Sequence, residues 1–483
     1  MALNVEGWTA PAVLPPATIP IAFYAPSQIV VARYADRGFI TRAADTPAHA
    51  LYEHRLLSDA EHGQAVADAI TVGGQVALTV GDLELWNGDD VFNAIAAQGR
   101  MDGRAITLRT APVTNRAASD WGSSLAAATR VWAGRVSRVD AAGLRARIVV
   151  SDVGDRLSTL LQSQLYDGAG GLGGTAELKG LPKPVSIGKR FNITPVFVGN
   201  VDLGDGALPT YQSHHREMAG HDAVRIRGVL QELVGSAPGI GQWTDHFDIG
   251  CFQLGAAPDG PVTCDVRGDA PERRYAKNIA DVIRTLLTAL GPGLTLADFD
   301  AQTWFEMGPR LAAEIGWGIG ATPITTQEAL AQVLTSCGAW LSGSRAGQLR
   351  IALVGAPAAT ADLTLTQADL IDVKPDPLPA ELQPTPQAVE VRAVRNWTPL
   401  DDIAGSVDGD ARAALVSEGA YERAFSNAIA ARSTSARTLR LEGLYALAAD
   451  AQARAAELRT WLERGLRLIT VTTDRYLGQV ELG

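Results

Sequence analysis

The chain has 483 residues, of which 46% are hydrophobic and 20% are charged, and its formal net charge at pH 7 is −11. The length predicts two to four domains, and the composition predicts a folded, soluble protein. The acidic balance gives no electrostatic reason to bind nucleic acid, which needs basic surfaces. No apolar run reaches the roughly 20 residues that a membrane span needs.

The N-terminal segment and the cysteines bear on where the chain is made. Residues 1–26 are apolar but contain several prolines and lack a basic start, so no signal peptide is expected. Cys251, Cys264 and Cys337 are an odd set without CxxC spacing, so no disulfide framework is predicted. Synthesis in a reducing cytoplasm is expected.

Residues 1–155 are predicted to form a β-domain with an extended N-terminal arm. The segments 74–86 and 103–113 contain alternating apolar and polar residues, the pattern of strands with one buried face. The segment 131–153 is the clearest hairpin, because two such runs flank a DAAG turn. Ahead of these strands, 58–70 is predicted to be a short helix or an ordered loop.

Residues 156–215 are predicted to be a proline- and glycine-rich connector that includes a helical piece at 156–165. Residues 216–270 are predicted to be a second, smaller β-region in which a PDG turn joins the last two strands. The strands of this region are expected at 222–229, 246–254 and 260–268.

Residues 271–390 are predicted to form an α/β domain. A helix is expected at 275–290, where apolar residues recur at helical spacing. A second helix begins at a capping box formed by Thr325 and Glu328 and ends at Gly338, and a β-hairpin follows it.

Residues 391–483 are predicted to repeat this order of elements. A strand at 436–443 precedes a long helix at 444–465, and two strands follow at 467–474 and 477–483. The apolar stripe of the helix is expected to pack on the two strands that follow it. The similarity between the two regions is architectural, since no residue-level repeat is found.

The glycine-rich segments 167–180 and 180–199 do not match a phosphate-binding loop. Such a loop needs GxxxxGK[ST], whereas here Gly188 and Lys189 are followed by Arg190 and lack the earlier glycine. The GAGGLGG run contains no GxGxxG either. A surface loop is therefore predicted for 167–180, and no nucleotide site.

The histidines do not form a recognisable metal or catalytic pattern. The HHREMAGH stretch at 214–221 lacks the spacing of zinc ligands and is predicted to be a solvated loop. His246 lies beside Asp245 and Asp248, an arrangement compatible with acid–base chemistry. Its place at the start of a predicted strand favours an ordinary surface histidine.

No nucleophile or metalloprotease motif is found. Neither GxSxG nor HExxH occurs, and the carboxylate pairs Asp89–Asp90 and Asp401–Asp402 fall in turn-like stretches. The scattered tryptophans are predicted to be core and interface anchors. The sequence therefore predicts no enzymatic activity and no catalytic, cofactor-binding or metal-binding residue.

Several stretches, taken in order along the chain, resemble the baseplate or tail-tip hub proteins of long-tailed (siphovirus-like) bacteriophages. They are 39–70 leading into 81–112, the hairpin and following segment at 131–161, the 180–199 stretch with 208–229, and 248–269 leading to 324–354. The resemblance implies an α+β, β-rich, multidomain fold with β-barrel-like hub domains and helix-plus-hairpin domains. Some similar hubs carry a peptidase or lysozyme domain or an iron–sulfur cluster, but this chain lacks the extra domain and the clustered cysteines.

The same resemblance implies a structural role in the virion. Similar hubs are homotrimers at the tail tip that close the distal end of the tail tube. The implied partners are further copies of the chain, the distal tail ring protein, the tail tube, the tape-measure protein, and fibre or spike proteins. DNA is expected to pass the acidic channel without specific binding. The alternatives are a hexameric distal tail ring protein and a tail-associated enzyme that degrades cell walls.

The resemblance also suggests a role for the stretch 180–199. Its prolines favour extended backbone, and Lys183, Lys189 and Arg190 are basic groups in an acidic chain. The stretch is expected to be an extended arm packed against a neighbouring domain or subunit, with its basic groups occupied at protein interfaces. An interdomain linker is the alternative.

Overall fold

The computed structural model describes residues 2–8, 30–57, 62–66, 74–80, 82–97, 101–110, 128–151, 153–344, 346–353, 364–378, 382–433, 435, 437–465 and 467–473. Within these ranges the chain is β-rich and multidomain, with several separate sheets, as predicted. No helix there is long and apolar enough to cross a membrane. Most of the expected N-terminal arm and the expected strand at 477–483 lie outside the described residues. The division into five domains stays a prediction.

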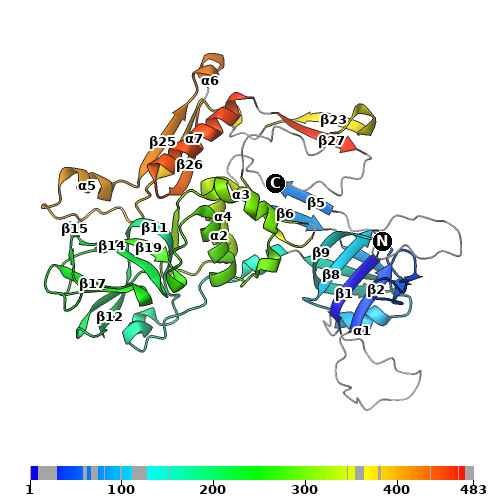
Figure 1. The fold of residues 1–483 in the computed structure, drawn as a ribbon, viewed down its shortest axis with the longest axis horizontal. Coiled ribbons are helices and arrows are strands. Elements are labelled where there is room, and N and C mark those ends of the chain that lie inside the picture. Colours follow the sequence, from blue (N-terminus) through cyan, green and yellow to red (C-terminus); the bar gives the residue numbers. More distant parts are fainter. Residues whose placement is uncertain are drawn as a thin grey trace, which may run out of the picture.

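An eight-stranded sheet forms the N-terminal unit, which lies at the lower right of Figure 1. Its strand order is β3-β4-β2-β1-β8-β9-β10-β7, and helix α1 (Val91–Ala97) packs against β9. The strands are β1 (Ala2–Trp8), β2 (Val30–Ala35), β3 (Phe39–Ile40), β4 (Leu51–His54), β7 (Leu83–Trp86), β8 (Ala105–Thr110), β9 (Thr129–Ala142) and β10 (Arg145–Ser151).

The hairpin predicted at 131–153 is confirmed as β9 and β10. Ala146 and Ile148 are buried while Arg145 and Arg147 face solvent, as alternation requires. Leu144 is 70% exposed because it lies in the turn rather than in the strand. The sheet curls, since residues 55–57 bond to β7 through backbone hydrogen bonds. The described strands nevertheless form no closed barrel.

Two five-stranded sheets form the second β-unit. Their orders are β15-β14-β19-β11-β20 and β12-β13-β18-β17-β16. The strands are β11 (Val185–Ile193), β12 (Val196–Asp202), β13 (Ala207–Gln212), β14 (Met218–Ile226), β15 (Val229–Leu230), β16 (Glu232–Leu233), β17 (Gln242–His246), β18 (Cys251–Leu254), β19 (Val262–Asp269) and β20 (Gly316–Ile319).

The 180–199 stretch belongs to these sheets. It forms β11, which lies between β19 and β20, and the start of β12, so it is neither a free arm nor a linker. Val185 and Ile187 belong to the largest hydrophobic cluster, whereas Ile193 belongs to the cluster of the second β-unit. The prolines flank the strands, and the apolar run between them is therefore core rather than interface. The helical piece expected at 156–165 is only a 3₁₀ turn, Val153–Ser158.

Helices and a four-stranded sheet form the helical unit, which lies between the N-terminal sheet and the second β-unit in Figure 1. The helices are α2 (Ile279–Thr285), continued by a π-helical turn (Leu286–Leu290), α3 (Ala301–Met307) and α4 (Thr326–Cys337). The sheet order is β22-β21-β6-β5, with β21 (Ala339–Gly343), β22 (Leu349–Leu353), β6 (Gly74–Val80) and β5 (His62–Val66).

Of two predictions for the helical unit, the capping box is confirmed and the structure predicted at 62–66 is wrong. The capping box of α4 is confirmed, because Thr325 accepts a bond from the Glu328 N–H and the Glu328 carboxylate accepts from the Thr325 N–H. Gly338 caps the other end with a left-handed φ of 70°. The short helix or ordered loop expected at 58–70 is wrong for 62–66, which pair with β6 as strand β5.

A three-stranded sheet, three helices and a two-stranded ribbon form the C-terminal unit. The sheet order is β25-β24-β26, and the ribbon pairs β23 with β27. The elements are β23 (Leu370–Asp376), β24 (Ala388–Ala393), α5 (Gly409–Val416), β25 (Ala420–Phe425), α6 (Asn427–Arg432), β26 (Thr438–Tyr445), α7 (Ala448–Glu463) and β27 (Leu468–Thr473).

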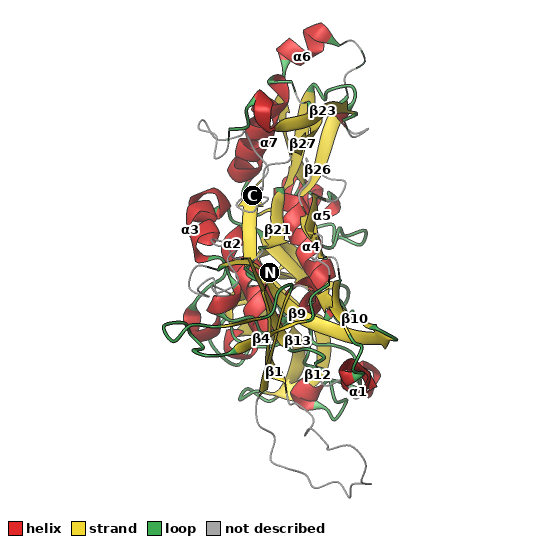
Figure 2. Ribbon diagram, turned by 90° about the vertical axis from the view of Figure 1, so that its right-hand side faces the viewer, coloured by secondary structure: helices red, strands yellow, loops and turns green. Residues whose placement is uncertain are grey.

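The predicted long helix is present as α7, but it packs elsewhere than expected. It packs on β24, β25 and β26 rather than on β27, and Figure 1 shows it beside β25 and β26. Figure 2 shows α7 in the upper part of the molecule, above α2 and α4. It begins at Ala448 because Tyr445 still pairs with Ala393 of β24. Leu458 and Leu462 are buried in a cluster that also includes α2 and α4, so the helical and C-terminal units share one continuous core.

The first prediction concerns the glycines of β20. A Cβ on Gly318 would overlap the Val185 carbonyl and lie 2.5 Å from Nη1 of Arg190, whereas nothing lies within 4 Å of a Cβ on Gly320. Overpacking of this kind typically costs about 1–3 kcal/mol. Gly318→Val is therefore expected to lower the melting temperature, and Gly320→Ala to leave it nearly unchanged. Equal melting of the two variants would contradict the close approach.

The second prediction concerns α7. Leu458 is fully buried against the sheet, so Leu458→Ala removes core contacts and is expected to cost about 2–5 kcal/mol in the free energy of unfolding. Gln452 lies on the exposed side of the same helix, and Gln452→Ala should change that free energy by less than about 0.5 kcal/mol. Denaturant unfolding of both variants provides the measurement.

Candidate functional site

The histidine cluster lies in the interior of the second β-unit. His214 is fully buried and His221 is 4% exposed, so the expectation of a solvated loop is wrong. The chain passes here from β13 of one sheet to β14 of the other, so residues 213–217 connect the two sheets and 218–221 begin β14. The polar side chains of the cluster bond to one another there, as buried polar groups must.

His221 lies between a serine and an aspartate. Its Nε2 is 2.9 Å from Oγ of Ser213, and its Nδ1 is 2.8 Å from Oδ1 of Asp245. The backbone N–H of His221 donates to the other Asp245 oxygen at 3.0 Å. The carboxylate therefore fixes Nδ1 as a donor and leaves Nε2 to accept from the serine. This is the connectivity of a Ser–His–Asp hydrolase triad.

The surroundings of Ser213 do not suit hydrolysis. Ser213 is only 1% exposed, and its Oγ lies 3.5 Å from Sγ of Cys264 on the interior side. The His221 ring packs edge-on against Trp243 and Phe252. A hydrolase needs space for an acyl carbon about 3 Å from the hydroxyl, next to oxyanion donors. The arrangement therefore supports a role in joining β14 to β17.

The buried cysteines are also poor candidates for chemistry. Burial raises the pKa of the Cys264 thiol to about 12, the Cys251 thiol to about 12 and the Cys337 thiol to about 11. The thiolate is the reactive form, and almost none is present near neutral pH. Among the described residues, no group of three or more His, Cys, Asp or Glu side chains could hold a metal ion.

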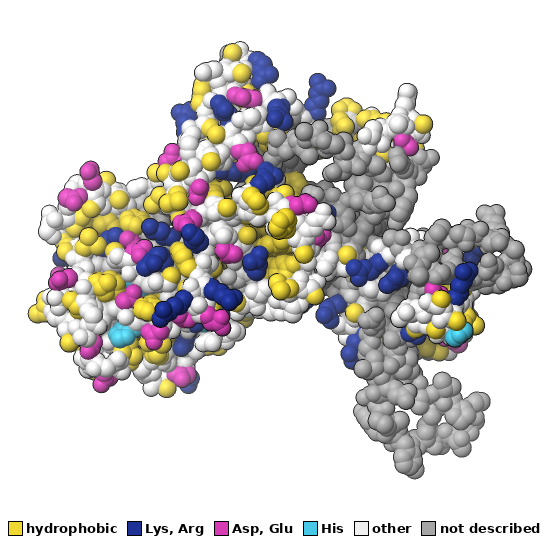
Figure 3. Space-filling view, viewed as in Figure 1, with side chains coloured by type: hydrophobic (Ala, Val, Ile, Leu, Met, Phe, Trp, Pro, Cys, Tyr) yellow, Lys and Arg dark blue, Asp and Glu magenta, His cyan; other side chains and the backbone are white. Residues whose placement is uncertain are grey.

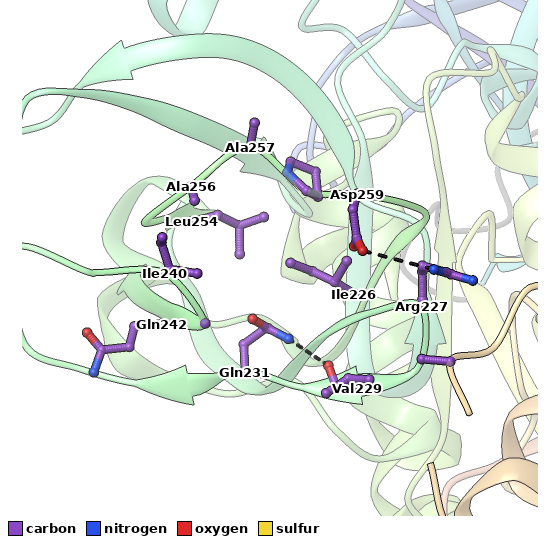
Figure 4. Close-up of a pocket in the computed structure, with 13 residues that line it drawn as sticks. Ile226, Arg227, Val229, Gln231, Ile240, Gln242, Leu254, Ala256, Ala257 and Asp259 are labelled. Atoms are coloured by element: carbon purple, nitrogen blue, oxygen red, sulfur yellow. Dashed lines mark hydrogen bonds and ion pairs between the residues drawn. The ribbon is translucent and has the colours of Figure 1, made fainter. Parts of the chain in front are cut away.

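An open cavity of about 400 Å³ lies in the second β-unit (Figure 4). The β14–β15 hairpin, β17 and residues 254–259 form its walls, and Ala404 of the C-terminal unit contributes to the rim. The Arg227 guanidinium at one side binds Asp402 at 2.8 Å and faces Asp259 at 4.0 Å. The lining combines apolar side chains such as Ile226, Ile240 and Leu254 with the polar groups of Gln231, Gln242 and Asp259.

The ribbon of β23 and β27 exposes an apolar face. Val373 pairs with Val471 and Pro375 with Ile469, which places these four side chains on one side of the ribbon. Val373 is 48% exposed, Val471 38% and Ile469 55%. Figure 3 shows hydrophobic side chains over the ribbon at the upper right. Nothing in the described part of the chain covers this face.

The remaining sequence candidates have structural partners. Asp89 binds both Nη atoms of Arg55 at 2.8 and 2.6 Å, and Asp402 binds Arg227. His246 ends β17 instead of beginning a strand, and it bonds to Gln253 at 3.1 Å. The 167–180 segment forms two 3₁₀ turns held by its own backbone bonds.

Two of the three basic groups expected at protein interfaces are occupied inside the chain. Lys183 donates to the Leu172 carbonyl at 3.1 Å, and Arg190 is buried beside Trp397. Lys189 is exposed. Interior contacts of this kind carry no sequence signal, because they join segments that lie far apart along the chain.

Comparison with known proteins does not identify a family for this chain. No protein-family model and no curated protein matches this chain. Among solved structures, it is similar to a chain of the virion of a native gene transfer agent (GTA) particle. The alignment covers 56% of this chain and 80% of that chain at 12% sequence identity, with a TM-score of 0.21. A likeness at that TM-score carries no argument about fold or function.

The third prediction tests the structural role of the Ser213–His221–Asp245 group. Asp245→Ala leaves two donors of His221 without an acceptor, and a buried unsatisfied group typically costs about 1–3 kcal/mol. A lower melting temperature is expected. Asp248, three residues along, is exposed, and Asp248→Ala should melt like the parent. Unchanged melting of Asp245→Ala would rule out this role.

Proposed function

We propose that this chain is a structural protein of a virion, the hub at the distal end of the tail of a long-tailed bacteriophage. The proposal holds that the chain works by forming interfaces and has no enzymatic activity. Its support is the sequence resemblance described above together with the unpartnered apolar ribbon. The ribbon is the observation that carries it, because exposed apolar surface of this kind marks a place where another protein binds.

A ribbon of two strands is marginal in water. A two-stranded pair usually needs a third strand or a packed layer for stability, and open strand edges invite pairing with other chains. β23 and β27 come from segments more than 90 residues apart, so no tight turn between them sets their register. Covering Val373, Val471 and Ile469 would remove apolar surface from water, and a partner chain supports the ribbon in this way.

The first partner proposed is a second copy of the chain. Rotational symmetry closes such an assembly into a ring, and the resemblance implies three copies. The ring would sit at the virion tail tip and contact the distal tail ring protein, the tail tube, the tape-measure protein and a fibre or spike. DNA would pass through it without specific binding, because the chain is acidic overall.

One observation favours a second candidate function, that of a hydrolase. The Ser213–His221–Asp245 connectivity is that of a triad, but the hydroxyl has no open space beside it. Incubation of the purified chain with peptidoglycan separates the two functions. Turnover that Ser213→Ala abolishes would favour the enzyme over the structural protein.

The fourth prediction tests the ribbon as an interface. Val373→Asp with Val471→Asp places two charges on the apolar face and is expected to convert the assembly to single chains of 50.9 kDa. The parent should have three times that mass by light scattering at micromolar concentration. Six copies would instead favour the distal tail ring protein.

The matched control changes the other face of the ribbon. Thr472 is exposed and pairs with Asp372, so Thr472→Lys adds a charge without touching the apolar side chains. It should leave the mass of the assembly unchanged. A parent chain that is a stable monomer would contradict the proposal, as would assembly that survives the paired aspartates.

A further inference from the structure

Two adjacent histidines lie beside β11 and β19 in the second β-unit, His214 fully buried and His215 partly buried. The ring centres of His214 and His215 are 4.7 Å apart, and the rings are tilted by 56°. His214 is surrounded by Ser213, Ser186 and Asp269. This pair lies outside the ribbon of β23 and β27 that is proposed as an interface.

Both ring nitrogens of His214 are committed in its neutral form. The backbone N–H of Ser186 donates to Nδ1 at 3.1 Å, so Nδ1 carries no proton. Nε2 lies 2.9 Å from Oδ1 of Asp269 and donates to it, since that carboxylate also accepts from Arg216 at 2.6 and 2.9 Å. A further proton could bind only at Nδ1, where it would face the Ser186 N–H. Protonation therefore breaks a bond between the histidine and β11.

The charges around the pair agree with this geometry. Burial lowers the pKa of His214, and Asp269 opposes that effect only in part, while Arg216 and Arg190 add to it. Burial, followed by His214 and Arg216, lowers the pKa of His215 to about 3. Burial alone would raise the pKa of Asp269, but hydrogen bonds from His214 and Arg216 hold it below its ordinary value.

His221 differs from the pair in its bonding. Its Nε2 accepts from the Ser213 hydroxyl, and a hydroxyl can turn its hydrogen away. That contact involves no backbone group, whereas the Nδ1 contact of His214 joins its ring to the backbone of β11.

We propose that His214 and His215 form an acid-sensitive switch that holds residues 213–217 against β11 and β19 at neutral pH and releases them in acid. In the released state the rings take up protons near their ordinary pKa of about 6.5. The closed state is therefore fully favoured above about pH 6.5. Below about pH 6.5, the relative population of the closed state falls about tenfold per pH unit for each histidine, until the pH reaches the pKa of that histidine in the closed state.

Release would be local to the second β-unit. The hydrophobic cluster of that unit is separate from the cluster that joins the helical and C-terminal units. Strand β11 contributes residues to both clusters. Its Val185 and Ser186 pair with Ile319 and Gly318 of β20. Loss of the Ser186 contact would loosen the edge of β11 next to that joint, while α2 and α4 keep their own core.

Hydrogen–deuterium exchange of the full chain tests the switch. Peptides covering 183–190 and 211–217 are compared with peptides of α2 and α4 at about pH 7.5 and about pH 5.5, with labelling times corrected for the intrinsic exchange rate. At the lower pH, one unit below 6.5, each histidine contributes about tenfold. Protection in the first two segments is expected to fall by up to about a hundredfold more than in the helices.

The paired variant His214→Asn with His215→Gln removes both titrating rings and leaves an amide oxygen near the Ser186 N–H. Its protection should not depend on pH in this range. His246→Gln is the matched control, because His246 bonds to Gln253 outside the pair, and it should respond like the parent.

Three results would overturn the proposal. Equal protection of the parent at both pH values excludes a switch. Loss of protection that persists in the paired variant excludes these histidines as its cause. Simultaneous loss in all peptides shows global unfolding instead of local release. If the paired variant does not fold, the comparison of segments within the parent still decides between local release and the alternatives.

Discussion

The joint between the second β-unit, the helical unit and the C-terminal unit depends on one buried cation. Arg190 is 7% exposed, and no carboxylate among the described residues pairs with it. Its guanidinium lies 4.1 Å from the Trp397 ring centre, and one Nη donates to the Ser186 hydroxyl at 2.9 Å. Burial lowers the pKa of Arg190 to about 9. An unpaired buried charge is costly, so the ring and the hydroxyl must offset part of its lost hydration.

The surroundings of Arg190 follow from that requirement. Gly316 and Gly318 of β20 leave room for its side chain, since a Cβ at either position would collide with it or with the β11 backbone. Asn192, two residues on, adopts a left-handed φ of 53° and donates to Asn396 and to the Thr398 carbonyl. β11 therefore fixes the position of residues 396–398, which lie between β24 and α5 of the C-terminal unit.

Polar and apolar groups are distributed unusually in this molecule. Serine, histidine and aspartate side chains that elsewhere carry out catalysis are buried in the second β-unit, where they join strands. Valine and isoleucine side chains on the ribbon of β23 and β27 face solvent. Under the proposed function, another chain covers the exposed apolar face of the ribbon.

Local patterns in the sequence determined many of the elements. The alternation in β9 and β10, the capping box of α4 and the helical spacing of α2 and α7 are patterns of short segments, which can be recognised without knowing the distant partners of those segments. The tertiary structure decided what non-local contacts control. It made the 180–199 stretch a central strand, because β19 and β20 pair with it from both sides. It turned the histidines inward, because Ser186, Asp245 and Asp269 reach them from distant strands, and such partners are not visible in spacing along one chain.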